Sequence, residues 1–404
     1  MRRLCSAVGS GAIGRAAALR IIAMLFGLAA SIAIARLGGA EVKGVYSAFA
    51  AGLSLAFLFV NFDLPQQALR AARAESAIDA VLPWMRRPWL AFLAAGSVVS
   101  IIGLTFVEAL VPYGIGLAIV TVSTQAGVVA MGTRGPVNYA VSAVVQQGVA
   151  LALALMLGLA GYLTTASAVT VVLVSLAVPL IVLWKGAPVS VFSQSTLNLN
   201  VKRLLGGGAA WQTVRSLQTA MLKIDLLWVT FLMGPKMAGI YSVAVSTAML
   251  VNIVPQQISN QLLSDVLRRK SMEWRRPLLL AVLSGFGTAL VLGLAAWPLL
   301  PLVYGTEFAA SRVPMVVAMC GAVAYGGLQV VSNYVRNLGT RRDYLAFMAP
   351  GAVAMIGTLL ISVPRAGLVG AAASFAVGMS ASTAFGAMVS SKVKARVVEE
   401  SADD

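Results

Sequence analysis

Long apolar stretches are the feature that most restricts what this chain can fold into. Each has about 20 residues, the length at which an α-helix crosses the hydrocarbon core of a bilayer. The stretches are continuous rather than alternating, which argues against a membrane β-barrel. Because lipid offers no partner to an unpaired backbone group, each stretch is expected to be a helix. Twelve spans are predicted, at residues 13–36, 43–62, 88–108, 114–131, 139–160, 164–184, 208–233, 238–262, 278–302, 313–335, 344–362 and 367–390.

The composition indicates a protein that crosses the membrane many times. Of its 404 residues, 59% are hydrophobic and 11% are charged, against about 25% charged in a soluble domain. The net charge of +16 comes from basic residues scattered over short loops, so no nucleic-acid partner is expected. Without histidine, and with only the distant Cys5 and Cys320, neither a metal site nor a disulfide framework is expected. No cleavable signal peptide is recognisable, so the first span is expected to act as a signal-anchor.

The basic residues predict the orientation of the chain, because cytoplasmic loops carry an excess of Lys and Arg. The predicted internal loops contain Arg70, Arg73, Arg86, Arg87, Arg134, Lys185, Lys202, Arg203, Arg268, Arg269, Lys270, Arg275, Arg276, Arg336, Arg341 and Arg342, and the tail adds Lys392, Lys394 and Arg396. The opposite loops contain Lys43, Lys236, Arg312 and Arg365, with Arg36 at a helix end. Both termini are therefore predicted to be cytoplasmic.

Two motifs recur in the same order and indicate a parallel internal repeat. LGGAEVKGVYSAF (37–49) precedes DLPQQ (63–67), and MGPKMAGIYSVA (233–244) precedes VPQQ (254–257). In transporters built on such repeats, the substrate binds between the halves; chance similarity of short glycine turns is the alternative. The predicted organisation is an N-terminal six-helix lobe (1–184), a cytoplasmic linker (185–207), a C-terminal six-helix lobe (208–391) and a cytoplasmic tail (392–404).

Charged residues inside the predicted spans are costly, and they often mark a functional site. The first span carries Arg15 and Arg20, and the seventh carries Arg215, Lys223 and Asp225. For the arginines of the first span, snorkelling to the cytoplasmic headgroups is the alternative. For Lys223 and Asp225 the alternative is a buried pair that fixes helix packing, although residues two apart on a helix point away from each other.

Polar residues accompany these charges. On a continuous seventh helix, Gln212, Arg215, Thr219 and Lys223 would share one face, with Gln218 and Asp225 beside it. Together with polar residues of other spans they suggest one hydrated cavity between the halves; hydrogen bonding between helices is the alternative. The cavity would be cationic, which suits a diphosphate. Substrate binding is expected from Arg15, Arg20, Arg215 and Lys223, ion coupling from Asp225, and cavity lining from Gln212, Gln218, Thr219, Asn252, Gln256 and Asn333.

At these residues the chain resembles bacterial polysaccharide flippases, the O-antigen and capsule transporter branch of the multidrug/oligosaccharidyl-lipid/polysaccharide exporter (MOP) superfamily. The similar stretches are ARLGGAEVKGVYSAF (35–49), DLPQQALR (63–70), KIDLLWVTFLMGPKMAGIYSVA (223–244), YGTEFAASRVPM (304–315), NYVRNLGTRRDYLAF (333–347) and PRAGLVGAAASFAVG (364–378). The resemblance implies two six-helix lobes in the bacterial inner membrane. The family's Lys-x-Asp pattern in the seventh helix matches Lys223 and Asp225. Some relatives have 14 helices, whereas 12 are predicted here.

The resemblance implies a flippase that moves a polyprenyl-diphosphate-linked oligosaccharide to the outer leaflet by alternating access. The expected partners are this substrate, the bilayer, and the glycosyltransferases and polymerase of the same pathway. No enzyme signature or P-loop is recognisable, so no catalytic residue, cofactor or metal is expected. One alternative is a drug/cation antiporter of the same superfamily, which a cationic cavity disfavours. Another is a non-transporting assembly protein for polysaccharide enzymes, in which the charges only pack.

Overall fold

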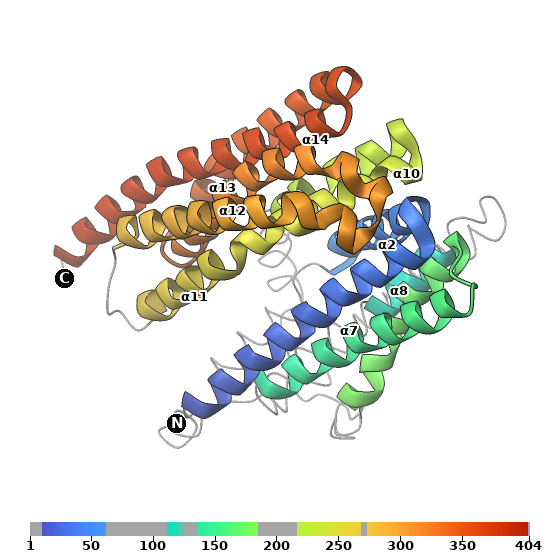
Figure 1. Ribbon diagram of the computed structural model, residues 1–404. Coiled ribbons are helices and arrows are strands. Elements are labelled where there is room, and N and C mark those ends of the chain that lie inside the picture. The colour runs from blue at the N-terminus through green and yellow to red at the C-terminus, as the bar shows by residue number, and fades with distance from the viewer. Residues whose placement is uncertain are drawn as a thin grey trace. The chain divides into compact units, whose positions relative to one another are not determined.

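The computed structural model describes residues 10–61, 111–120, 123, 136–184, 216–267 and 273–402, and within these ranges the chain is helical without a β-strand. The chain divides into two compact units, Met1–Gln212 and Thr213–Asp404. The first contains α2 (Ser10–Asn61), α7 (Pro136–Leu159) and α8 (Thr165–Trp184). The second contains α10 (Ile224–Met249), η4 (Leu250–Asn252), α11 (Ile253–Leu267), α12 (Arg275–Tyr304), η5 (Thr306–Ser311), α13 (Arg312–Leu338) and α14 (Arg341–Ala402). Figure 1 shows these elements.

The apolar helices make this a multi-pass membrane protein, as predicted. Within the described residues, six helical segments are long and apolar enough to cross a membrane: Ala18–Phe57, Ala140–Leu159, Ser216–Leu262, Arg275–Tyr304, Thr306–Leu338 and Arg341–Arg396. The predicted span 88–108 and the predicted linker 185–207 lie outside the described residues. The all-helical architecture is therefore confirmed, whereas the number of twelve helices and the two-lobe repeat stay predictions.

Glycines with positive φ lie where one helix ends and the next begins. In the described part of the chain these are Gly39, Gly161, Gly234, Gly305 and Gly367. Three of them interrupt the helical segments α2, α10 and α14, and Figure 1 shows the chain reversing within α2 and within α14. A side chain is disfavoured in this conformation, so glycine allows the tight turn. Four of the five lie between predicted spans and Gly367 is the first residue of one, and all five are on the side that the basic loops assign to the outside.

In the first unit, α2 packs against α7 and α8. The core joins the three helices through small and branched side chains such as Ile34, Ala154 and Ala168. Gly158 of α7 lies directly under Leu37 of α2, because a Cβ at this glycine would collide with the leucine side chain. Such small residues let membrane helices approach closely.

In the second unit, α13 is the central helix and contacts α10, α11, α12 and α14. Its Leu328, Val331 and Tyr334 side chains are fully buried. At Gly321 a Cβ would lie 2.9 Å from the Cα of Ala376, so α13 and α14 are in close backbone contact there. By contrast, α12 exposes many large apolar side chains. In a membrane, lipid can cover such apolar side chains at no cost.

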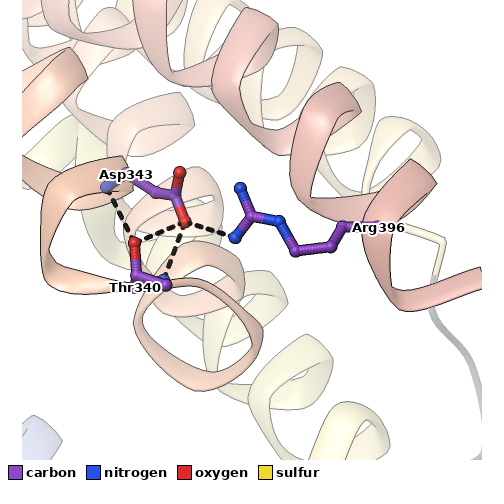
Figure 2. Close-up of polar contacts among 3 residues, drawn as sticks. All are labelled: Thr340, Asp343 and Arg396. Carbon is purple, nitrogen blue, oxygen red and sulfur yellow. Dashed lines mark hydrogen bonds and ion pairs between the residues drawn. The ribbon is translucent and has the colours of Figure 1, made fainter. Parts of the chain in front are cut away.

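Polar contacts among Thr340, Asp343 and Arg396 stabilise the second unit at the connection between α13 and α14 (Figure 2). The Thr340 N–H and hydroxyl donate to Asp343 Oδ2, each at 2.8 Å, and the Asp343 N–H donates back to Thr340 Oγ1 at 3.3 Å. This reciprocal pattern is a capping box, which satisfies backbone donors at a helix start. The Arg396 guanidinium reaches the same Asp343 oxygen at 3.1 Å. Asp343, in the first turn of α14, is therefore bonded to Arg396, which is 53 residues later in the same element.

Candidate functional site

The charged stretch of the predicted seventh span is not one continuous helix. Residues 216–221 are helical, Leu222 and Lys223 form a turn, and α10 begins at Ile224. The φ angle of Lys223 is −132°, far from the helical value of about −63°. The prediction of an unbroken helix over 208–233 is therefore wrong in its described part.

The backbone at this interruption is overwound. The Leu222 N–H donates to Thr219 O at 3.1 Å and the Lys223 N–H to Ala220 O at 3.0 Å. These bonds reach back three residues, as in a 3₁₀ turn, and such a stretch within a helix often marks a hinge or a strained sequence. Because the helical rotation is not kept through the turn, the predicted common face of Thr219 and Lys223 does not follow from helical spacing.

Asp225 lies in the first turn after the interruption and is only 2% exposed. Its Oδ2 accepts a 2.6 Å hydrogen bond from the Tyr241 hydroxyl, and its Oδ1 accepts a 2.8 Å bond from the Leu226 N–H. A carboxylate is also favoured at a helix N-terminus by the helix dipole. The bond to Tyr241 spans the Gly234 break, so it ties the two helical segments of α10 together.

The alternative of a Lys223–Asp225 pair is not seen. Among the described residues, ion pairs join Lys394 to Glu273 and Arg396 to Asp343, whereas Lys223 and Asp225 form none. The partner of Asp225 is Tyr241, and the sequence analysis missed its role. Tyr241 belongs to the motif MGPKMAGIYSVA (233–244), which the sequence analysis used only to identify the repeat. An aspartate and a tyrosine on either side of a glycine turn are the signal that could have indicated the bond.

Gln218, before the interruption, is bonded to α14. The Tyr344 hydroxyl donates to Gln218 Oε1 at 3.1 Å. Tyr344 is buried, and its ring packs against Phe347 with 4.7 Å between the centroids. The short helix before the interruption is thus held by α14, while the helix after it is held by Tyr241.

A second irregular stretch follows α10. The 3₁₀ segment η4 precedes Pro255, whose missing N–H and bulky ring disturb the helix one turn earlier. Asn252, at the end of η4, is buried, and its Oδ1 has no hydrogen-bond partner in the described part of the chain. Gly326 of α13 accommodates this kink, because a Cβ there would lie 2.8 Å from Pro255.

The other predicted lining residues of the second unit occupy different environments. Thr219 and Gln256 are half-buried. Asn333 of α13 donates a 2.8 Å hydrogen bond from Nδ2 to Ser259 Oγ of α11, so it also serves as a contact between helices. The assignment of Gln218, Thr219, Asn252, Gln256 and Asn333 to a shared cavity stays a prediction.

The predicted basic residues are only partly described. Arg15 and Arg20 of α2 belong to the first unit, and both side chains are exposed. Lys223 of the second unit is half-buried. Arg215 and Gln212 lie outside the described residues. The joint action of the four basic residues on one substrate therefore stays a prediction.

Known structures with the same architecture are transporters. The lipid II flippase MurJ in an inward closed conformation matches with a TM-score of 0.71 and 11% identity, over 92% of this chain and 86% of MurJ. An inward-facing multidrug resistance MATE family transporter of the MOP superfamily matches with a TM-score of 0.64 and 16% identity, over 94% and 99% of the two chains. At these identities the likeness shows the fold alone.

A third similar structure comes from Pyrococcus furiosus. It is a MOP superfamily transporter described as having a binding pocket of reverse polarity that suggests a different function. Its TM-score is 0.61 at 17% identity, over 95% of this chain and 96% of that one. No model of a protein family and no curated protein matches the chain. The chain thus has a fold found in MOP superfamily transporters, which can differ in the polarity of the pocket.

Proposed function

We propose that the chain is a MOP superfamily transporter that flips a polyprenyl-diphosphate-linked oligosaccharide from the cytoplasmic to the outer leaflet for surface polysaccharide biosynthesis. The fold shared with the MurJ flippase supports a lipid-linked substrate. In the proposal, Arg15, Arg20, Arg215 and Lys223 neutralise the diphosphate through charge-assisted hydrogen bonds. The sugar then crosses between two six-helix lobes while the lipid tail stays in the bilayer.

The observation that carries the proposal is the difference in accessibility between Asp225 and the basic residues predicted to bind the substrate. Asp225 is buried, and both of its oxygens accept hydrogen bonds from the protein. Arg15 and Arg20 are exposed, and Lys223 is half-buried. The charges that these residues offer to a ligand are therefore positive, which favours an anionic substrate.

Reconstituted transport tests this assignment. In proteoliposomes with a fluorescent polyprenyl-diphosphate sugar, Arg20→Gln and Lys223→Gln should each lower the transport rate at least tenfold, roughly the effect of losing one charged hydrogen bond of 1.5–3 kcal/mol. Lys236→Gln is the matched control, because Lys236 is an exposed lysine two residues after Gly234. Unchanged transport in both variants would contradict the binding assignment.

Asp225 is proposed to couple transport to protons or sodium. Its carboxylate ties the two segments of α10 through Tyr241, so binding of a cation there would change the bond that spans the Gly234 break. Asp225→Asn keeps a carbonyl oxygen for Tyr241 but cannot bind a proton in the same way. Transport by this variant should continue without a response to an imposed ion gradient. An undiminished response would place the coupling elsewhere.

A drug/cation antiporter is the second candidate. It is favoured by the likeness to MATE transporters and by the membrane acid Asp225, which could pair with a cation. The two candidates predict opposite results for one experiment. A deletion strain of the flippase loses surface polysaccharide and keeps its drug resistance, whereas a deletion strain of the antiporter becomes drug-sensitive and keeps its polysaccharide.

The proposed cellular setting is the bacterial inner membrane, with both termini cytoplasmic. The clustered basic residues at the α11–α12 and α13–α14 connections support this orientation. A C-terminal fluorescent protein should be bright, and a C-terminal alkaline phosphatase inactive. Glycosyltransferases and the polymerase of the pathway are proposed partners, which crosslinking in living cells can detect. An active phosphatase fusion would reverse the proposed direction of transport.

A further inference from the structure

An apolar groove of about 600 Å³ lies between α12 and α13 on the surface of the second unit. Phe286, Leu290, Leu294 and Trp297 line it from α12, and Val316 and Cys320 line it from α13. The groove is hollow because small residues, Ala289 and Gly293, lie between these large side chains. A Cβ at Gly293 would meet only Met319 Sδ, at 3.6 Å, so the space beside this glycine is unfilled.

The length of the groove matches the depth of one leaflet. It extends from Phe286 to Trp297 along α12, which is about 16 Å at 1.5 Å per residue. Half of a hydrocarbon core of about 30 Å is about 15 Å. Trp297 lies toward the Tyr304 end of α12, opposite the basic Arg275 end. The groove thus lies mostly in the half of α12 that the basic loops assign to the outside, and it extends about 5 Å past the middle of the helix toward the Arg275 end.

A basic side chain stands at the headgroup end of the groove. Arg312 is one helical turn before the lining residue Val316, and its Cζ lies 5.8 Å from the centre of the Trp297 ring. No ion pair or hydrogen bond to a described residue occupies its guanidinium, and its buried Nε has no hydrogen-bond partner there. This cation–π contact favours the guanidinium next to the indole. This arrangement offers a fixed positive charge at the depth where lipid phosphates lie.

We propose that this groove binds one anionic phospholipid of the outer leaflet, with an acyl chain along α12 and the phosphate on Arg312. The apolar lining and the length of about 16 Å argue for the occupant, since one acyl chain can fill such a groove. The charge argues for its headgroup, because an anionic phosphate gains more from Arg312 than a zwitterionic headgroup does. The site is separate from the proposed substrate residues and does not depend on which substrate is transported.

Lipid-dependent stability of the purified protein tests the proposal. After detergent removal of bound lipid, phosphatidylglycerol in mixed micelles should raise the melting temperature by roughly 2–5 °C, and phosphatidylcholine by clearly less. Polyprenyl diphosphate without sugar is the third probe. If it protects Cys320 in the groove from alkylation more than phosphatidylglycerol does, the occupant is the lipid tail of the substrate and the proposal is overturned.

Two variants remove the two halves of the site. Arg312→Gln should remove the preference for phosphatidylglycerol, while Arg365→Gln, at another exposed external arginine, should keep it. Gly293→Phe should fill the groove and lower the stabilisation by either phospholipid. Val291→Phe is its control, because Val291 is 66% exposed on the same helix but does not line the groove. Equal effects of target and control variants would overturn the proposal.

A measurement on the unmodified groove covers the case in which Gly293→Phe fails to fold. Cys320 is an exposed free thiol in the groove, and Cys5 is the other cysteine of the chain. In a Cys5→Ser background, phosphatidylglycerol should slow the alkylation of Cys320 by an apolar maleimide severalfold more than phosphatidylcholine does. Alkylation at the same rate with both lipids would show that no anionic lipid is selected.

Discussion

The two units contain the same backbone turn with opposite charges beside it. In α2 the turn is Gly39 (φ 78°, ψ −179°), and in α10 it is Gly234 (φ 83°, ψ 172°). A tyrosine follows each glycine by seven residues, Tyr46 in the first unit and Tyr241 in the second. The Lys43 Nζ lies 5.2 Å from the centre of the Tyr46 ring, whereas the Tyr241 hydroxyl donates to a carboxylate.

The equivalent positions explain this reversal. Asp225 precedes Gly234 by nine residues, and the residue nine before Gly39 is Ala30; Lys43 follows Gly39 by four, and the residue four after Gly234 is Ala238. At these two positions each unit therefore has one charge and one alanine, and all four residues are buried. A tyrosine can serve both, because its ring face attracts a cation and its hydroxyl donates to an anion. The turn is thus shared, but only the second unit has a buried acid near it, since Glu41, two residues after Gly39, is exposed.

The largest expected effect on stability comes from Asp225→Ala, which gives the second unit the alanine that the first unit has at the equivalent position. Asp225→Ala leaves the buried Tyr241 hydroxyl and the Leu226 N–H without their acceptor. At about 1–3 kcal/mol for each unsatisfied buried group, the free energy of unfolding should fall by about 3 kcal/mol. Thermal unfolding in detergent, followed by circular dichroism, measures the loss. Asp225→Asn is the control and should lose less than half as much; equal losses would mean that the hydrogen bonds do not stabilise the turn.

The two tyrosines should respond differently to removal of their hydroxyls. Tyr241→Phe leaves Asp225 buried with one partner fewer, which should cost about 2 kcal/mol. Tyr46→Phe keeps the ring over which Lys43 lies, so its cost should stay below about 0.5 kcal/mol. The same unfolding measurement compares them. Similar losses in the two variants would contradict the view that one unit uses the ring and the other the hydroxyl.

The two glycines should respond alike, because the turn is the shared part. Gly234→Ala and Gly39→Ala should each lower the free energy of unfolding by about 1–2 kcal/mol, the cost of a side chain at positive φ. At Gly234 the cost is purely conformational, since a Cβ would meet no atom within 4 Å. Gly287→Ala is the control, because Gly287 is helical and equally open. A loss at Gly287 as large as at Gly234 would contradict the assignment.

The smallest effect on stability is expected at a surface ion pair. Its contribution can be compared with that of the buried hydrogen bond between Tyr241 and Asp225. The Lys394 ammonium lies 2.8 Å from Glu273 Oε2, with both side chains exposed. This hydrogen bond, with help from the Arg275 N–H, lowers the pKa of Glu273. The pair therefore stabilises the fold above the ordinary glutamate pKa of about 4.3, and this contribution is lost as the pH falls through the lowered value.

Because the pair is exposed, Lys394→Ala should cost only about 0.5 kcal/mol at pH 7. The difference from the unchanged protein should disappear in acid, below the pKa of Glu273. Melting curves between pH 7 and pH 3 measure it, with Lys392→Ala, an exposed lysine two residues away, as the control. A difference that grows in acid would contradict the sign of the pKa shift.

Sequence reasoning reached the parts of the site that depend on local patterns. Apolar length identified the helices, and the motifs around Gly39 and Gly234 identified two turns that have the same backbone conformation. It also singled out Asp225, because a carboxylate in an apolar stretch is unusual. It failed at Lys43, which counted as an external-loop charge but is only 4% exposed. The burial of a charge beside a turn depends on the side chains that pack around it, and linear order does not show these.

The sequence by itself determined that this is a helical membrane protein and where several helices reverse, because span length and glycine turns are properties of short segments. Only the tertiary structure decided which residues meet. The break at Leu222–Lys223, the Asp225–Tyr241 bond and the groove between α12 and α13 depend on how helices pack across a turn. A small rotation of one helix would change each of these contacts while leaving the apolar pattern of the sequence unaffected.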